Sequence, residues 1–161
     1  MNHIGGTRDG FESLTFLVSL CTNKDIMVEV GVYTGESLFF YGENFKRCIG
    51  VDPWKNGYPP GDAGATSAER AYPMFLENLK EWEATGKNNI EYMKLRGDEA
   101  CLQFEDNSLD FVYIDAEHTE KGVADDIKCW YSKVKIGGVI AGHDYAKPGI
   151  KPGVDGVLKD V

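Results

Sequence analysis

Acidic residues follow short apolar stretches at five places in this sequence. Each stretch has the length of a buried strand, and the acid, alone or with a glycine, comes where the stretch ends. A buried carboxylate is costly unless a partner compensates its charge. We therefore expect these side chains to surround a ligand that is cationic or rich in hydroxyl groups. They are Glu29, Asp52, Asp98, Asp115 and Asp144, with His143 directly before the last.

The first stretch leads into a turn that contains Gly31 and Gly35. This pattern predicts a strand, a tight turn and a helix start, as in nucleotide sites where backbone must approach a ligand closely. The dinucleotide fingerprint fails because Tyr33 fills the place of its second glycine, and the P-loop fails because no Gly-Lys-Ser/Thr follows. The turn carries no basic residue. The ligand indicated is therefore a positively charged nucleoside, and S-adenosylmethionine (SAM) fits.

The parts of SAM suggest a role for each polar group. Glu29 would lie beneath the methionine end, organising the turn and offsetting positive charge. Asp52 suits the ribose hydroxyls, as the equivalent acid does in other doubly wound nucleotide sites. Trp54 would cover the adenine face, although simple packing is the alternative. Asp98 suits the adenine amino group, with Gly97 giving it room.

Strands alternate with helices along the chain. The alternation predicts an α/β fold, in which right-handed crossovers build a parallel sheet that binds ligands at the carboxyl ends of its strands. Residues 55–65 are rich in glycine and proline, which indicates a loop that either covers the ligand or simply connects two elements. The expected strands are 26–32, 47–52, 90–95, 109–116 and 139–145; the expected helices are 9–20, 36–43, one from 66 or 73 to 86, 99–104, 122–135 and 154–159.

Length and composition narrow the class of protein. The 161 residues fit a single domain, 1–161, and the net charge of −9 argues against nucleic acid as the main partner. No apolar run approaches the ~20 residues of a membrane span, and the first residues lack the features of a signal peptide, so we expect a cytoplasmic protein without a membrane partner. The four cysteines form no CxxC pair. We expect them to pack as small apolar side chains in a reducing compartment, without zinc or a disulfide.

Three segments together resemble the motifs of class I SAM-dependent methyltransferases: 29–37 (EVGVYTGES), 112–118 (VYIDAEH) and 137–145 (GGVIAGHDY). The likeness is to the small-molecule, Methyltransferase-24-like group and extends over about residues 10–157. It implies a doubly wound, Rossmann-like parallel sheet of order 3-2-1-4-5. It also implies a set of residues along or close to SAM, which comprises Gly31, Tyr33, Gly35, Ser37, Asp52, Asp98 and Asp115.

The family's sheet normally gains two further strands after its last helix. This sequence stops at Val161, before them. The C-terminal antiparallel hairpin is therefore expected to be missing, either because this member is short or because the sequence is incomplete. Proteins usually cover an exposed edge strand, so we expect a homo-oligomer that covers this one.

Methyl transfer to a hydroxyl group requires a base that removes its proton. His143 is the first candidate and His118 the second, because a histidine titrates near working pH; the alternative is that each bonds only loop backbone. Asp144 joins them as a catalytic candidate. Asp115 and Asp144 end strands expected to lie ~4.8 Å apart. They could share Mg²⁺ or Ca²⁺, or Asp115 could contact the cofactor while Asp144 caps a loop.

These observations favour an enzyme that transfers a methyl group from SAM to a small, hydroxylated acceptor. Two alternatives remain open. One is a SAM- or nucleoside-binding module without turnover, which the early end of the chain suggests. The other is an NAD-dependent oxidoreductase, against which Tyr33 in the glycine turn argues.

Overall fold

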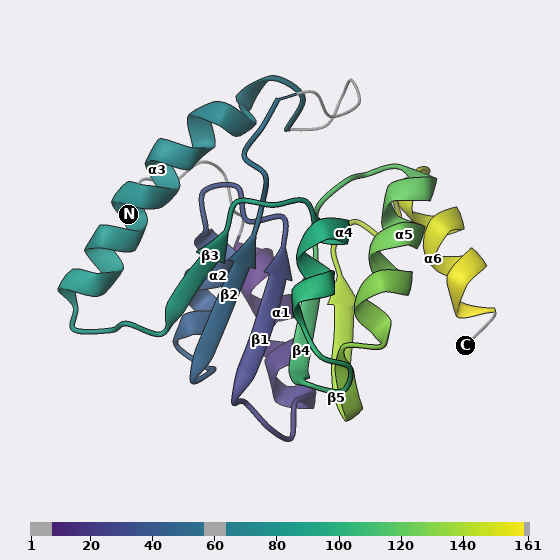
Figure 1. Cartoon of the computed structure of the whole chain (residues 1–161), viewed down its shortest axis with the longest axis horizontal. Helices are drawn as coiled ribbons and strands as arrows, with labels where there is room; N and C mark the ends of the chain where they lie inside the picture. The colour runs from purple at the N-terminus through teal and green to yellow at the C-terminus, as the bar shows by residue number, and fades with distance from the viewer. Residues whose placement is uncertain (1–7, 57–63, 160–161) are drawn as a thin grey trace.

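Five parallel strands form one sheet in the computed structural model, which describes residues 8–56 and 64–159 (Figure 1). The order is β3-β2-β1-β4-β5, so β1 lies at the centre and β4 follows it on the side away from β2. The predicted α/β class and strand order are confirmed. The strands are β1 Ile26–Val30, β2 Arg47–Val51, β3 Ile90–Met93, β4 Leu109–Ile114 and β5 Val134–Gly142.

Helices cover both faces of the sheet because successive strand residues alternate between the faces. Met27 and Phe111 lie in a largely aromatic core with α1, α2 and α3, whereas Val28 and Val112 lie in an aliphatic core with the helices that follow β3 and β4. In Figure 1, α4 and α5 stand on the near side of the sheet and α1 on the far side. No helix within 8–56 and 64–159 is long and apolar enough to cross a bilayer. The helices are α1 Arg8–Leu20, α2 Glu36–Gly42, α3 Gly64–Ala84, α4 Gly97–Ala100, the 3-10 turn η1 Cys101–Gln103, α5 Glu120–Tyr131 and α6 Ile150–Leu158.

Helix α3 begins earlier than either predicted start and runs through Pro73 without a break. A proline inside a helix removes one backbone hydrogen bond. The apolar face of α3 compensates for the lost hydrogen bond, because Phe75 and Trp82 are buried in the aromatic core. Most of the loop expected at 55–65 lies outside the residues that the structure describes.

The prediction for β5 was wrong at both ends. The preceding helix stops at Tyr131 instead of residue 135, and β5 begins at Val134, which pairs with Leu109. A register shift lies between the pairs formed by Leu109 and Phe111, and Gly137 adopts a φ of +81° there, so the strand absorbs the two glycines that were expected to end the helix. β5 ends at Gly142, which leaves His143 and Asp144 in the loop beyond it.

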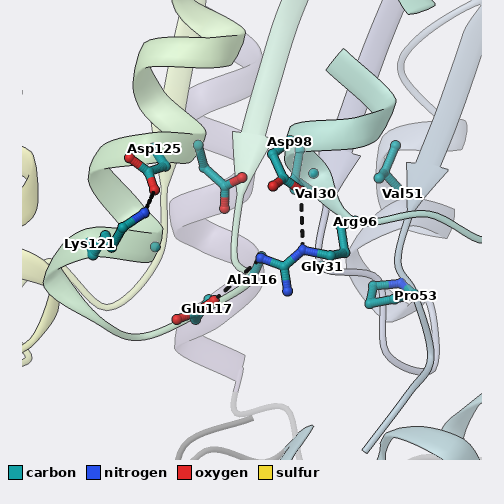
Figure 2. A pocket seen from close by; sticks show the side chains of 13 residues that line it. Val30, Gly31, Val51, Pro53, Arg96, Asp98, Ala116, Glu117, Lys121 and Asp125 are labelled. Atoms are coloured by element: carbon teal, nitrogen blue, oxygen red, sulfur yellow. Dashed lines mark hydrogen bonds and ion pairs between the residues drawn. The ribbon is translucent and has the colours of Figure 1, made fainter. Parts of the chain in front are cut away.

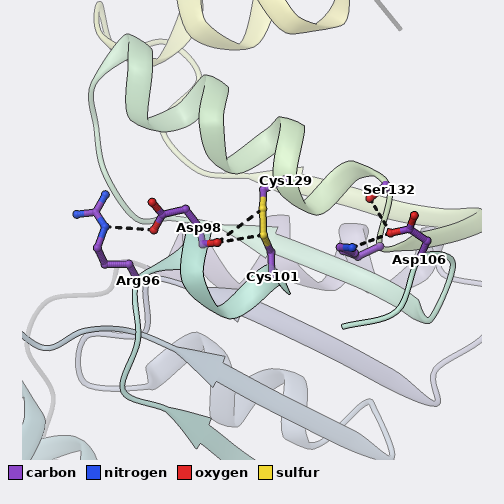
Figure 3. The surroundings of a disulfide bond; sticks show 7 residues. Arg96, Asp98, Cys101, Asp106, Cys129 and Ser132 are labelled. Atoms are coloured by element: carbon purple, nitrogen blue, oxygen red, sulfur yellow. Dashed lines mark hydrogen bonds and ion pairs between the residues drawn. A yellow bond between two sulfur atoms is a disulfide. The ribbon is translucent and has the colours of Figure 1, made fainter. Parts of the chain in front are cut away.

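Two cysteines form a disulfide, contrary to the sequence prediction. Cys101 in η1 and Cys129 in α5 are 28 residues apart, and their Cα atoms lie 6.2 Å from each other (Figure 3). Sequence spacing cannot reveal this pairing, because it arises from the packing of the turn after β3 against α5. Cys21 and Cys48 are buried free thiols, as expected.

Candidate active site

The turn after β1 holds three residues in left-handed backbone conformations. Gly31, Tyr33 and Gly35 have φ angles of +92°, +54° and +90°. A Cβ atom on Gly31 would lie 2.0 Å from the carbonyl oxygen of Asp115, so only glycine fits where the turn crosses the end of β4. Left-handed conformations at a non-glycine residue such as Tyr33 are uncommon and cluster at functional sites. The sequence-predicted turn is therefore present, at the carboxyl edge of the central strand.

Asp52, at the end of β2, holds this turn in place. Its Oδ2 atom accepts hydrogen bonds from the backbone nitrogens of Val32 and Tyr33, each at 2.9 Å, and its Oδ1 atom accepts one from Trp54 at 2.6 Å. Burial raises the pKa of this carboxyl group even though the three N–H donors oppose the increase. Asp52 does not line the cavity described below. Asp52 therefore organises the turn, and its contact with ribose hydroxyls stays a prediction.

Trp54 is a packing residue in this structure. Its side chain is only 2% exposed, its ring stacks on Phe75 with centroids 4.9 Å apart, and its Nε1 atom donates to the carbonyl oxygen of Tyr33 at 2.7 Å. A ring that stacks on a ligand needs an accessible face, and the buried Trp54 ring offers none. The packing alternative therefore describes Trp54 better than a cover for adenine does.

Glu29 carries an unsatisfied buried carboxylate oxygen directly beneath the turn. The residue is fully buried in β1; Ser37 donates to its Oε1 atom, and Oε2 has no hydrogen-bond partner among the described residues. Burial raises the pKa of Glu29 well above its usual value, with smaller contributions from Asp115 and Asp52. Buried polar atoms are normally hydrogen-bonded, and exceptions point to a missing partner. A ligand donor or cation at the turn would supply it, so Glu29 and Ser37 fit the predicted methionine end of SAM.

A polar cavity of about 240 Å³ opens at the carboxyl ends of β1, β2 and β4 (Figure 2). Arg96 lies across it, with Nε 3.2 Å from Asp98 and a terminal nitrogen 3.8 Å from Glu117, while Lys121 pairs with Asp125. Four acids therefore face two cations. The lining residues are Val30, Gly31, Val51, Pro53, Arg96, Gly97, Asp98, Ala116, Glu117, Lys121, Gly122, Asp125 and Asp126.

Asp126 is a cavity residue that sequence reasoning missed. It is 8% exposed, and burial, followed by the charges of Asp98 and Glu117, raises its pKa to about 7. A signal was present, because position 126 falls between Val123 and Trp130 on the apolar face of the predicted helix. An acid on a buried helix face is unusual and indicates either a partner or a function.

A second group of charged side chains gathers beyond β4 and β5. His118 Nε2 lies 3.3 Å from Asp115 Oδ1 and 3.2 Å from Asp144 Oδ2, and His143 Nδ1 lies 3.3 Å from Asp144 Oδ1. Lys147 also pairs with Asp144, whose backbone adopts a φ of +59°. Burial opposes ionisation of Asp144, but Lys147 and the two histidines lower its pKa below the usual value. The structure thus brings all three predicted catalytic residues together with Asp115.

An apolar cavity of about 210 Å³ lies beside this group. Asp115, His118 and His143 are at its polar end, and residues of β4, α5, β5 and α6 form most of the rest. Ala116 and Glu117 line both this cavity and the polar one, so the two spaces meet at the loop that follows β4. The apolar walls include Ile114, Val123, Ile127, Ile140, Ile150, Val154 and Leu158.

The predicted site residues thus fall into three sets. Gly31, Gly97 and Asp98 line the polar cavity. Asp115, His118 and His143 line the apolar cavity, with Asp144 against both histidines. The remaining residues lie in or beneath the glycine turn without lining either cavity; they are Glu29, Tyr33, Gly35, Ser37, Asp52 and Trp54.

A parallel sheet of this order, with a glycine turn after its central strand and acids along its carboxyl edge, matches the Rossmann-like fold of class I SAM-dependent methyltransferases. Comparison with protein families narrows this class. The chain belongs to a methyltransferase domain family, whose model matches residues 28–145. SAM is the cofactor of that family.

Individual relatives are more distant. The uncharacterised protein R132 of Acanthamoeba polyphaga mimivirus is 27% identical over 143 residues, which cover 83% of this chain and 59% of that protein. This chain therefore spans about three fifths of the length of its curated relative.

Solved structures share the fold at low identity. A SAM-dependent O-methyltransferase of Thermotoga maritima superposes with a TM-score of 0.68 at 13% identity, over 99% of this chain and 52% of that one. A candidate methyltransferase of Streptococcus mutans in complex with SAH also gives 0.68, at 14% identity, over 98% of this chain and 84% of that one. An rRNA methylase of Streptococcus thermophilus gives 0.65 at 13% identity, over 98% and 82%.

Proposed function

We propose that this protein transfers the methyl group of SAM to a hydroxyl group of a small acceptor. One observation carries the proposal: the polar cavity beside the glycine turn and the apolar cavity beside the histidines meet at Ala116 and Glu117. A cofactor in the first cavity would present its methyl group to an acceptor in the second. Holding two reactants in contact in this way supplies a large part of the rate of a bimolecular transfer.

The polar cavity suits the nucleoside of SAM, and Glu29 suits its cationic end. The nucleoside would lie between Pro53 and Gly97, where Asp98 also lines the cavity. The lining contains no row of unpaired basic residues that would favour a phosphate group. The unsatisfied Glu29 Oε2 atom marks the place for positive charge beneath the turn. An NAD-dependent oxidoreductase is a weaker alternative, since the Tyr33 side chain stands where a pyrophosphate needs glycine.

His143 would act as the base in the transfer. Its Nδ1 atom faces Asp144, which leaves Nε2 to take the proton of the acceptor hydroxyl as a new C–O bond forms and the C–S bond to the sulfonium breaks with its electron pair on sulfur. The side chain is 56% exposed and lines the apolar cavity, so an acceptor can reach it. His118, held between Asp115 and Asp144, would orient the carboxylates and is the second candidate base.

The same residues offer ligands for a divalent ion. One atom from each of Asp115, His118 and Asp144 lies within 4.8 Å of the other two. Such an ion would polarise an acceptor oxygen; carboxylates alone suit Mg²⁺ or Ca²⁺, and the imidazole adds Mn²⁺ and Zn²⁺ as candidates. It would have to displace Lys147 from Asp144. Calorimetric titration with each ion tests this, and an Asp115→Asn variant should abolish any binding that occurs there.

The experiment for the main proposal follows product formation. Purified protein with SAM and a panel of phenols, catechols and aliphatic alcohols should release S-adenosylhomocysteine (SAH) with at least one acceptor class. Tight SAM binding without SAH release from any acceptor or cell extract would instead support the binding module without turnover. Calorimetry with NAD in place of SAM tests the oxidoreductase alternative, because a protein that binds SAM and does not bind NAD cannot be an NAD-dependent oxidoreductase.

Two further expectations stay predictions. β5 is an edge strand of the described sheet, and Ile136 on it is 99% exposed, which supports self-association there; light scattering tests it.

A cytoplasmic location conflicts in part with the Cys101–Cys129 disulfide, because such bonds persist mainly in oxidising compartments. Cell fractionation with thiol labelling would decide between a cytoplasmic pair of thiols and a stable disulfide.

A further inference from the structure

Asp126 is the carboxylate of the polar cavity that forms no ion pair with a described residue. Arg96 lies against Asp98 and Glu117, and Lys121 pairs with Asp125. Among the described residues, neither a hydrogen bond nor an ion pair reaches Asp126, although more than nine tenths of it is buried. Asp126 lines the cavity, so a hydrogen-bond donor that arrives with a ligand can reach its carboxylate.

The carboxylate of Asp126 lies against the backbone of Gly97. A Cβ atom at position 97 would lie 2.5 Å from its Oδ1 atom, so any other residue there would displace it. Gly97 also precedes Asp98 at the start of α4, which sets the two aspartates on neighbouring parts of one wall. Gly97 therefore makes room for Asp126, in addition to the room that was predicted for Asp98.

We propose that Asp126 is a specificity-determining residue that accepts a hydrogen bond from the exocyclic amino group of an adenine base in this cavity. The inference rests on the proposed SAM-dependent function and deepens it. An amino group brings the N–H donor that the wall lacks. A keto base, such as hypoxanthine, would bring an oxygen acceptor against Asp126 in place of the amino donor.

The electrostatics of the wall agree with this assignment. Burial and the nearby charges of Asp98 and Glu117 raise the pKa of Asp126 to about 7, and Arg96 only partly opposes them. A ligand donor would therefore stabilise the carboxylate form that the empty wall disfavours. A site rejects the wrong ligand far more strongly when that ligand leaves polar groups of the site unpaired than when it merely fits the site's shape poorly.

The test compares SAH with its deaminated analogue S-inosylhomocysteine, in which a keto oxygen replaces the amino group and the neighbouring ring nitrogen N1 carries a proton. Isothermal titration should show the wild-type protein binding SAH at least about 100-fold more tightly than the analogue. In the Asp126→Asn variant, the side-chain amide can turn its NH₂ group toward the keto oxygen, so the preference should narrow at least about tenfold. Glu120→Gln is the matched control: it removes the same charge from an exposed position of α5 that lines neither cavity, and its preference should stay at the wild-type value.

Each outcome bears on the inference. Equal affinities for the two ligands in the wild-type protein, or a preference that Asp126→Asn leaves unchanged while both affinities fall together, would overturn it and show that Asp126 only supports α4. Those results leave the proposed function standing, since SAH still binds. A wild-type protein that binds neither ligand would overturn the proposed function and this inference with it. Asn is isosteric and removes a buried charge, and a thermal melt confirms that the variant folds.

Discussion

The Oδ2 atom of Asp52 lies 2.9 Å from the backbone nitrogen of Tyr33, so a carboxylate at the end of β2 fixes the conformation of the turn after β1. Two neighbouring strands thereby share one structural element at their carboxyl ends. Tyr33 has a φ of +54°, a conformation that costs about 1 kcal/mol or more for a residue with a side chain. The hydrogen bonds from Val32, Tyr33 and Trp54 to one carboxylate offset that cost.

Asp52→Asn should destabilise the protein and weaken cofactor binding together. The amide nitrogen would face a backbone N–H group, so at least one buried hydrogen bond is lost, at a cost of about 2 kcal/mol in the free energy of unfolding. Urea titration and SAM calorimetry measure the two effects. Glu91→Gln is the control, because it breaks an exposed pair with Arg47 on the same sheet and should change stability by less than about 1 kcal/mol. Unchanged SAM affinity in Asp52→Asn would show that the turn does not need this carboxylate.

Glu29→Gln should separate stability from binding. Burial raises the pKa of Glu29, so ionisation of this residue destabilises the fold and the destabilisation grows as pH rises. The neutral amide removes it, and the melting temperature at pH 8 should equal or exceed that of the wild type. SAM affinity should fall about tenfold or more, because the charge beneath the turn is gone. A variant that binds SAM as tightly as the wild type would exclude a role for Glu29 near the cationic end.

Asp126 should give the fold a measurable pH dependence. Its pKa is about 7 in the folded protein and near its usual value when unfolded, so the folded state holds the extra proton between these values. Stability from this group is therefore complete below about pH 4 and is lost as pH rises to about 7, by at most about 4 kcal/mol. The measurement is the unfolding free energy of wild type minus Asp126→Asn from pH 4 to 8. A flat difference would contradict the raised pKa.

Cys129→Ser should lower the stability of the oxidised protein. The disulfide closes a loop of 28 residues, for which chain entropy predicts a loss of about 3 to 4 kcal/mol when the bond is removed. Denaturation with and without reductant measures this, and reduced wild type should resemble the variant. Cys21→Ser controls for the change of sulfur to oxygen, because Cys21 is a buried free thiol. Identical unfolding of wild type with and without reductant would show that the bond does not contribute.

His143→Gln should reduce methyl transfer by about 100-fold in kcat while the affinity for SAH stays unchanged. The expected cause is loss of the proton acceptor alone, because the residue lines the apolar cavity and not the polar one. His118→Gln should give a smaller loss, since its contacts with Asp115 and Asp144 assign it to orientation. Activity that survives in His143→Gln but not in His118→Gln would exchange these two roles.

Local patterns predicted much of this fold because they report burial directly. Short apolar runs placed all five strands, and the acids that follow them reach one edge of the sheet because parallel strands end together. His118, His143 and Asp144 meet for the same reason. Glycine at position 31 was also predictable, since a turn that crosses the end of another strand leaves no space for a Cβ atom.

The remaining features depend on packing between segments far apart in the sequence. The Cys101–Cys129 bond forms because η1 packs on α5, and nothing in the spacing of the cysteines reveals it. Trp54 was expected to cover a ligand, but its ring is buried in the aromatic core, where it stacks on Phe75. β5 begins early because its first residue pairs with Leu109, a contact that overrides the helical pattern before it.

The sheet also divides the interior into two compartments that share few side chains. Residues with aromatic rings fill much of the compartment beneath α1, α2 and α3, whereas Ile114, Ile127 and Ile140 in the wall of the apolar cavity belong to the other compartment. Laboratory evolution of acceptor preference could therefore vary Ile140 or Val154 without disturbing the tryptophan-rich half that supports the glycine turn. Acceptor preference could then change while the cofactor site stays the same. The free-energy changes of substitutions on opposite sides of the sheet are expected to add, because the substituted residues do not contact one another.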